Sequence, residues 1–156
     1  EIASCLVGSE MCIRDRFQSR EDFDQALVDA LKVSKPDLVV LAGFMRILTP
    51  VMTKAFKNKI INIHPSLLPK YPGLDTHNSV IKNGDLKHGI TIHYVNEVLD
   101  GGEIIAQGEI SLSTNETLED LKARIHSIEH VMLPKVVSKF ADGTINTKKI
   151  IYEKFK

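Results

Sequence analysis

The sequence predicts an α/β fold with a mostly parallel sheet, chiefly from two apolar segments separated by a helix start. Leu38–Ala42 is an unbroken apolar run, as expected of a central parallel strand that is covered on both faces. Thr49 and Pro50 are typical of a helix N-cap and first helical position. Ile60–His64 is a second short apolar segment, and Pro65 ends it. Strand, helix and strand in this order predict a parallel pair.

Two longer helices are expected from their start signals and apolar spacing. One begins after Ser19, with Asp22 as a capping-box partner, because apolar residues recur at helical spacing over 23–31. The longest begins after Thr117, and Pro134 is expected to kink it. The apolar stripe of this helix is Leu121, Ile125, Ile128, Met132 and Val136.

The remaining elements follow from turn residues and alternation. Asn78–Asn83 is expected to form a short helix closed by Gly84. Ile90–Tyr94 alternates as a strand does, and Glu103–Ile110 is its expected partner. Ile145–Tyr152 is predicted to be a terminal hairpin or an edge strand.

Composition limits the classes of partner. The chain has 156 residues, of which 43% are hydrophobic and 26% charged, and Lys+Arg and Asp+Glu are both 20. These values are typical of a globular domain, and we expect neither a nucleic-acid nor a membrane partner. The six histidines lack a compact ligand spacing, so no metal site is expected.

Residues 1–16 differ from the rest because they show no helix or strand period. Leu6–Arg16 resembles the translation of a transposase adaptor used in sequencing libraries, so we interpret 1–16 as an artefactual segment. Residues 17–156 are then one domain whose natural start is missing. Both cysteines, Cys5 and Cys12, lie in the excluded segment, so the domain itself has no disulfide or thiolate metal site.

Three side chains suggest acyl transfer. Asn62 and His64 are two residues apart, so on a strand they point to the same side. An amide can donate to an oxyanion, and an imidazole can exchange a proton with a leaving group. Asp100 precedes two glycines, in a loop that can approach closely and stabilise a protonated imidazole.

These residues, with 41–48 (LAGFMRIL) and 64–73 (HPSLLPKYPG), resemble the phosphoribosylglycinamide formyltransferase family. The resemblance implies a three-layer, Rossmann-like formyltransferase fold. It also implies transfer of a formyl group from the co-substrate 10-formyltetrahydrofolate to the amine of glycinamide ribonucleotide, in de novo purine (IMP) biosynthesis. Asn62, His64 and Asp100 would be the catalytic residues, in a cytoplasmic enzyme that is a monomer or weak homodimer.

The resemblance also implies binding residues. Those for folate are Arg20, Met45, Arg46, Ile47, Leu48, Asn62, Asn96, Glu97, Val98, Leu99 and Asp100. Glu129 and His126 would contact the glycinamide substrate, although His126 stands where the family has glutamine and Asp75 where histidine is frequent. His93 is expected to support the site from its strand.

Alternatives stay open at this point. The family's first strands and its phosphate-binding loop have no counterpart after residue 16, so the chain as written is expected to be weakly active or inactive. Formyltetrahydrofolate deformylase and methionyl-tRNA formyltransferase are the enzyme alternatives. A non-enzymatic folate-binding fragment is the third. Residues 64–73 favour the purine enzyme, and the balanced charge speaks against tRNA.

Overall fold

The computed structural model describes residues 17–113, 115–146 and 149–156. The segment interpreted as artefactual, with both cysteines, lies outside these residues. The sheet contains β1 (Val39–Ala42), β2 (Ile60–His64), β3 (Lys87–Tyr94), β4 (Ile104–Ser111) and β5 (Ile151–Phe155), in that spatial order. The helices are α2 (Arg20–Ser34), α3 (Pro50–Ala55), α4 (Thr76–Lys82) and α5 (Leu118–Ala141).

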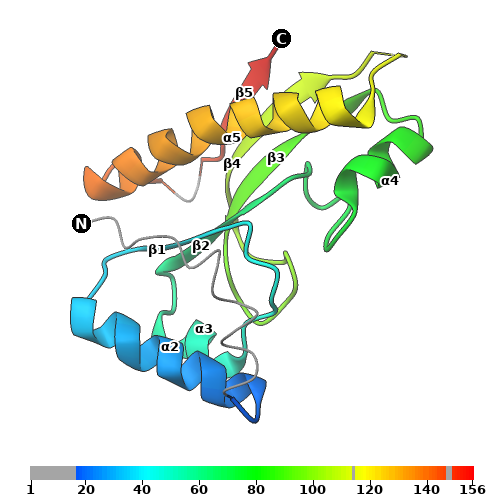
Figure 1. Ribbon diagram of the computed structural model, residues 1–156. Helices are drawn as coiled ribbons and strands as arrows, with labels where there is room; N and C mark the ends of the chain where they lie inside the picture. Colours follow the sequence, from blue (N-terminus) through cyan, green and yellow to red (C-terminus); the bar gives the residue numbers. More distant parts are fainter. Residues whose placement is uncertain (1–16, 114, 147–148) are drawn as a thin grey trace.

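The helices and sheet form the expected three-layer α/β arrangement (Figure 1). Helix α5 covers one face of the sheet over a core that includes Ile61 and Ile92. Helices α2 and α3 lie on the opposite side, over a second core that includes Met52 and Ile60. Ile60 and Ile61 belong to different cores because successive strand residues point to opposite faces. An apolar strand between two helical layers is what the sequence of β2 predicts.

The sheet is mixed. The pairs β1–β2 and β4–β5 are parallel, whereas β2–β3 and β3–β4 are antiparallel. The predicted parallel pairing of the first two strands is therefore confirmed. The prediction that Leu38–Ala42 is a central strand covered on both faces is wrong for the described residues. There β1 pairs only with β2, and Val40 is 37% exposed, because α2 and α3 cover only the face of Val39 and Leu41.

The predicted helix starts are confirmed. The Ser19 side chain accepts a hydrogen bond from the Asp22 N–H, and the Thr117 side chain accepts one from the Asp120 N–H. The stripe of α5 is fully buried, with Leu121, Ile125, Met132 and Val136 at 0% and Ile128 at 3% exposure. Helix α5 continues through Pro134.

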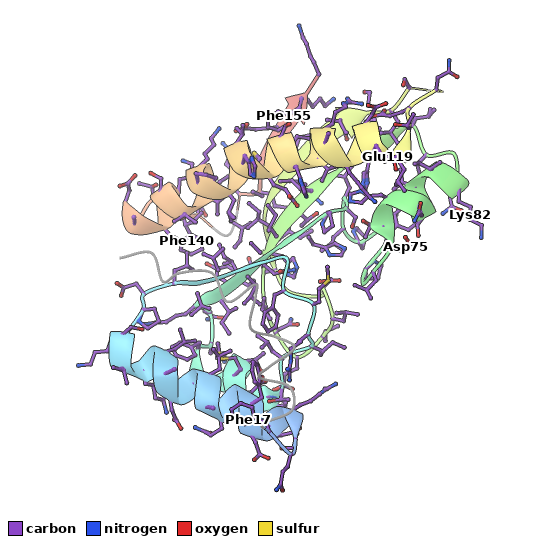
Figure 2. All side chains as sticks on the ribbon, in the orientation of Figure 1. Phe17, Asp75, Lys82, Glu119, Phe140 and Phe155 are labelled. Atoms are coloured by element: carbon purple, nitrogen blue, oxygen red, sulfur yellow. The ribbon has the colours of Figure 1, made fainter. Side chains whose placement is uncertain are left out.

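The C-terminal segment forms an edge strand, one of the two alternatives predicted for 145–152. The strand begins later than predicted, at Ile151, and pairs in parallel with β4 at the edge of the sheet. Figure 2 labels the two ends of α4 at Asp75 and Lys82, and α4 lies beside the first turns of α5 near Glu119. None of the described helices is long and apolar enough to cross a membrane.

A buried carboxylate fixes the start of α3. Thr49 is the N-cap residue as predicted, but its hydroxyl makes no capping hydrogen bond. Instead, its N–H and hydroxyl both donate to Asp24 Oδ2, at 2.6 and 2.8 Å. Asp24 is 2% exposed on α2, so this contact holds α2 and α3 together.

We expect Asp24→Ala to lower the free energy of unfolding by about 2–3 kcal/mol, because it leaves the buried Thr49 N–H without an acceptor. Urea unfolding followed by circular dichroism measures this. Asp29→Ala is the matched control, since Asp29 is exposed on the same helix and its carboxylate accepts from the side chain of Gln25, one turn away. Equal losses in the two variants would contradict the expectation.

Candidate active site

The polar residues predicted to be catalytic come from the end of β2. Asn62 and His64 lie on the face of β2 that is opposite to Ile61 and Ile63, as the alternation predicts. In the antiparallel pairing with β3, Asn62 is opposite His93. The Asn62 amide nitrogen lies 3.4 Å from His93 Nε2. The sheet register therefore places an amide and a second imidazole side by side.

Asp100 joins this group from the loop between β3 and β4. Its Oδ2 lies 3.6 Å from His64 Nδ1, and its Oδ1 lies 3.6 Å from His93 Nε2. The Gly73 N–H donates to Oδ2 at 2.7 Å. The carboxylate side chain is 9% exposed, and the residue has a left-handed backbone with φ 49°. The structure thus brings the three predicted catalytic residues together around one carboxylate.

Burial favours the neutral form of His93, and a backbone hydrogen bond fixes which ring nitrogen carries the hydrogen. His93 Nδ1 lies 2.7 Å from the Tyr94 carbonyl oxygen, so Nδ1 carries the hydrogen and donates it. Burial lowers the pKa of His93, although the Tyr94 carbonyl and Asp100 act in the opposite direction. The free lone pair on Nε2 then accepts one N–H of Asn62. Among the described residues the second N–H of the same amide has no hydrogen-bond partner, and Asn62 lines the cleft.

His64 is held between the carboxylate and a backbone carbonyl. Its Nε2 lies 2.8 Å from the Tyr71 carbonyl oxygen, and its Nδ1 faces Asp100. The residue is 5% exposed. His64 is not among the residues that line the neighbouring cleft, but Asp100, which it faces, does line that cleft.

An open cleft lies against this group and contains about 490 Å³ of space, including the part open to solvent. Three segments form its walls, from the end of β1, from β2 and β3, and from the loop before Asp100. The lining residues are Leu41, Phe44, Arg46, Ile47, Leu48, Asn62, His93, Val95, Asn96, Glu97, Val98, Leu99 and Asp100. The residues predicted to contact folate all line this cleft, with two exceptions.

The exceptions are Arg20 and Met45. Arg20 is the first residue of α2 and is exposed, and Met45 is 71% exposed. Neither belongs to the cleft wall. The neighbouring Arg46 guanidinium lies over the Phe23 ring, 3.9 Å from its centroid, so α2 supports this side of the cleft.

The predicted substrate residues lie on α5, outside the cleft. His126 Nε2 is 3.9 Å from Glu129 Oε2, one helical turn apart. Burial raises the pKa of Glu129, whereas His126 and His130 oppose this. Burial lowers the pKa of His77, and Lys122 and His126 of α5 add to this effect. Among the described residues, no three His, Cys, Asp or Glu side chains are arranged to hold a metal ion.

The glycines after Asp100 are required by close backbone contact. A Cβ at Gly102 would overlap the Tyr94 carbonyl oxygen. This is the same carbonyl that accepts from His93, so a side chain here would disturb both the loop and the imidazole.

We therefore expect Gly102→Ala to destabilise the fold by about 2 kcal/mol or more, as overpacking does. Gly143→Ala is the control, because a Cβ there meets nothing within 4 Å and only its left-handed backbone, φ 64°, is disfavoured. Thermal unfolding of both variants measures the difference. A Gly102 variant as stable as wild type would show that the loop is free to move.

Several cleft and contact residues were not predicted. Leu41, Phe44 and Val95 form part of the apolar wall of the cleft. The sequence identifies them only as hydrophobic residues and does not indicate that they line a cleft. The Gly73 N–H and the Tyr71 carbonyl are backbone groups, and the identity of their side chains does not reveal their role. His93 was expected only as a support, although its place opposite Asn62 follows from antiparallel pairing.

Comparisons with known proteins identify the family of the chain. A family model described as formyl transferase matches residues 4–137, a range that begins inside the segment interpreted as artefactual. Phosphoribosylglycinamide formyltransferase of Escherichia coli (strain K12) is 43% identical over 139 residues, or 89% of this chain and 66% of the relative. The Haemophilus influenzae enzyme is 43% identical over 136 residues, or 87% of this chain and 64% of the relative.

A solved structure gives the same result. Phosphoribosylglycinamide formyltransferase from Coxiella burnetii, in complex with CHES, has a TM-score of 0.80 and 40% identity, covering 88% of this chain and 68% of that one. The chain spans about two thirds of the length of its curated relatives, 66% and 64% in the two cases above. The family match over most of the chain, together with this agreement in fold, establishes that the chain belongs to the formyl transferase family.

Proposed function

We propose that this chain transfers a formyl group from 10-formyltetrahydrofolate to the amine of glycinamide ribonucleotide, a step of de novo purine biosynthesis. The observation that carries the proposal is the convergence of Asn62, His93 and Asp100 at the wall of a cleft, with His64 facing Asp100 from behind that wall. The names of the relatives support the same activity. The proposed enzyme is cytoplasmic, acts on small molecules, and is a monomer or a weak homodimer.

Asn62 stabilises the developing oxyanion. Attack of the amine on the formyl carbon gives a tetrahedral intermediate with a negatively charged oxygen, which needs a fixed donor. One Asn62 N–H is bound to His93, and that contact orients the amide. The other N–H donates to the formyl oxygen, with no side-chain reorganisation at the moment of reaction.

Asp100 and His64 handle the protons. The attacking amine must lose a proton, and the departing folate nitrogen must gain one. Asp100 lines the cleft and accepts the proton of the amine. His64 lies 3.6 Å from Asp100, and in its protonated form it stabilises the Asp100 carboxylate. Asp100 passes a proton on to the leaving folate nitrogen, and His64 replaces that proton on Asp100.

The cleft binds the folate. Backbone groups of Arg46–Leu48 and of Asn96–Leu99 face a pterin from two sides, and Leu41, Phe44 and Val95 supply apolar contact. Glu129 and His126 contact the second substrate from α5, where the raised pKa of Glu129 indicates a desolvated carboxyl.

A single-turnover assay tests the proposal. The chain is mixed in excess over 10-formyltetrahydrofolate carrying a ¹³C-labelled formyl group, with and without glycinamide ribonucleotide. The expected product is the N-formylated ribonucleotide, formed slowly because the sequence predicts weak activity. Labelled formate as the main product, at one rate with and without the amine, would instead support the deformylase alternative.

A further inference from the structure

The orientation of His64 depends on a backbone carbonyl. Tyr71 supplies this carbonyl, 2.8 Å from His64 Nε2. A carbonyl can only accept, so Nε2 carries a hydrogen and Nδ1 is the nitrogen that faces Asp100. A change in the direction of this carbonyl would turn the imidazole away from the carboxylate.

The backbone that presents this carbonyl is conformationally disfavoured. Tyr71 has φ 56°, in the left-handed region that is disfavoured for a residue with a side chain. Ser66, at 0% exposure, donates its hydroxyl to the carbonyl of Lys70 at 2.7 Å and to that of Tyr71 at 3.2 Å. These bonds fix the loop between β2 and α4 from its buried side.

A carboxylate just after α4 holds the outer side of the same loop. The Tyr71 hydroxyl donates to Asp85 Oδ2 at 2.6 Å, and Lys70 Nζ donates to Oδ1 at 2.8 Å. Asn83 donates its side-chain N–H to the Tyr71 hydroxyl at 2.9 Å. Lys70, and then Tyr71, lower the pKa of Asp85, so its carboxyl is ionised at neutral pH. The Asp85 side chain is 18% exposed.

We propose that Tyr71 and Asp85 form a positioning pair, which acts through the Tyr71 carbonyl to set the orientation of His64 toward Asp100. Neither residue lines the folate cleft, so the pair does not touch the folate. Its importance for catalysis rests on the proposed function, whereas its effect on the His64 ring does not. The two parts are therefore tested by separate measurements.

The first measurement is the exchange of the His64 Nε2 hydrogen with water, followed by nuclear magnetic resonance of the ¹⁵N-labelled chain. Tyr71→Phe removes the hydroxyl and keeps the ring, and Asp85→Asn removes the charge and keeps the shape. We expect exchange to be about tenfold faster in both variants, because breaking the charge-assisted bond between Tyr71 and Asp85 loosens the backbone that presents the carbonyl. Tyr152→Phe is the matched control, because it breaks another tyrosine–carboxylate bond, to Glu109, at the far edge of the sheet.

Unchanged exchange in both Tyr71→Phe and Asp85→Asn would overturn the proposal. Loss of the dispersed amide spectrum in both would overturn it too, because the pair would then hold the whole fold rather than one ring. The second measurement is the single-turnover rate, expected to fall about tenfold at unchanged folate affinity, since small misplacements of catalytic groups are costly. Faster exchange in a chain that shows no formyl transfer would support the pair and contradict the proposed function.

Discussion

Replacement of Asn62 by alanine is expected to slow formyl transfer by about 10²–10³-fold, the usual effect of removing one oxyanion donor. The amide lies at the cleft wall, and one of its N–H groups is already engaged by His93. The fold should tolerate the change, because Asn62 is only half-buried and its loss frees a single hydrogen-bond acceptor, His93 Nε2.

Two measurements separate chemistry from binding in this variant. The single-turnover rate should fall, while the dissociation constant for folate should change by less than about tenfold, as for an interaction made mainly in the transition state. Asn78→Ala is the matched control, because this asparagine is exposed on α4 and bonds to Asp75. A rate unchanged by Asn62→Ala would remove Asn62 from the mechanism.

The second large effect concerns stability at acid pH. His88 is 1% exposed, and its Nε2 lies 3.0 Å from His77 Nδ1. Burial, and then His77, lower the pKa of His88 from 6.5 to about 4. Because one nitrogen must donate and the other accept, protonation of both rings would break the contact.

The sign of the pH dependence follows from this lowered pKa. Between pH 6.5 and about 4 the unfolded chain binds a proton at His88 and the folded chain does not. The contribution of His88 is therefore fully present above pH 6.5, and falls by about 3 kcal/mol as the pH drops to about 4.

His88→Gln should flatten the stability profile over this window by about that amount, and the slope that is left should come from His77, whose pKa is also lowered. Urea unfolding at pH values across the window measures it, and His130→Gln is the control at an exposed position of α5. Parallel profiles for wild type and His88→Gln would contradict the assignment of a neutral buried His88.

Much of the candidate site could be predicted from the sequence, because the alternation of side chains along a strand determines which residues share a face. Alternation on β2 puts Asn62 and His64 on one face, and Pro65 ends the strand there. The same rule applied to β3 places His88 with Ile90 and Ile92 on the apolar face, which gives a signal for its burial. Asp100, by contrast, was a candidate only because two glycines follow it, since its distance from His64 depends on the conformation of the whole loop.

The remaining features depend on contacts between distant segments. An apolar run such as Leu38–Ala42 does not reveal how many of its faces are covered, and in the described residues β1 is an edge strand. The short strand β5 pairs with β4 although α5 separates the two strands in the sequence, and no local pattern predicts such a pairing. Backbone donors and acceptors, such as Gly73 and Tyr71, leave no mark in the side-chain sequence.

The most direct test of the central claim compares the wild-type chain and Asn62→Ala in single turnover with ¹³C-formyl folate and glycinamide ribonucleotide. We predict that the label moves to the ribonucleotide amine in the wild-type chain, slowly, and at least about 10²-fold more slowly in the variant. Transfer at equal rates in the two chains, formate as the sole product, or no transfer above the protein-free mixture would each contradict the proposed reaction.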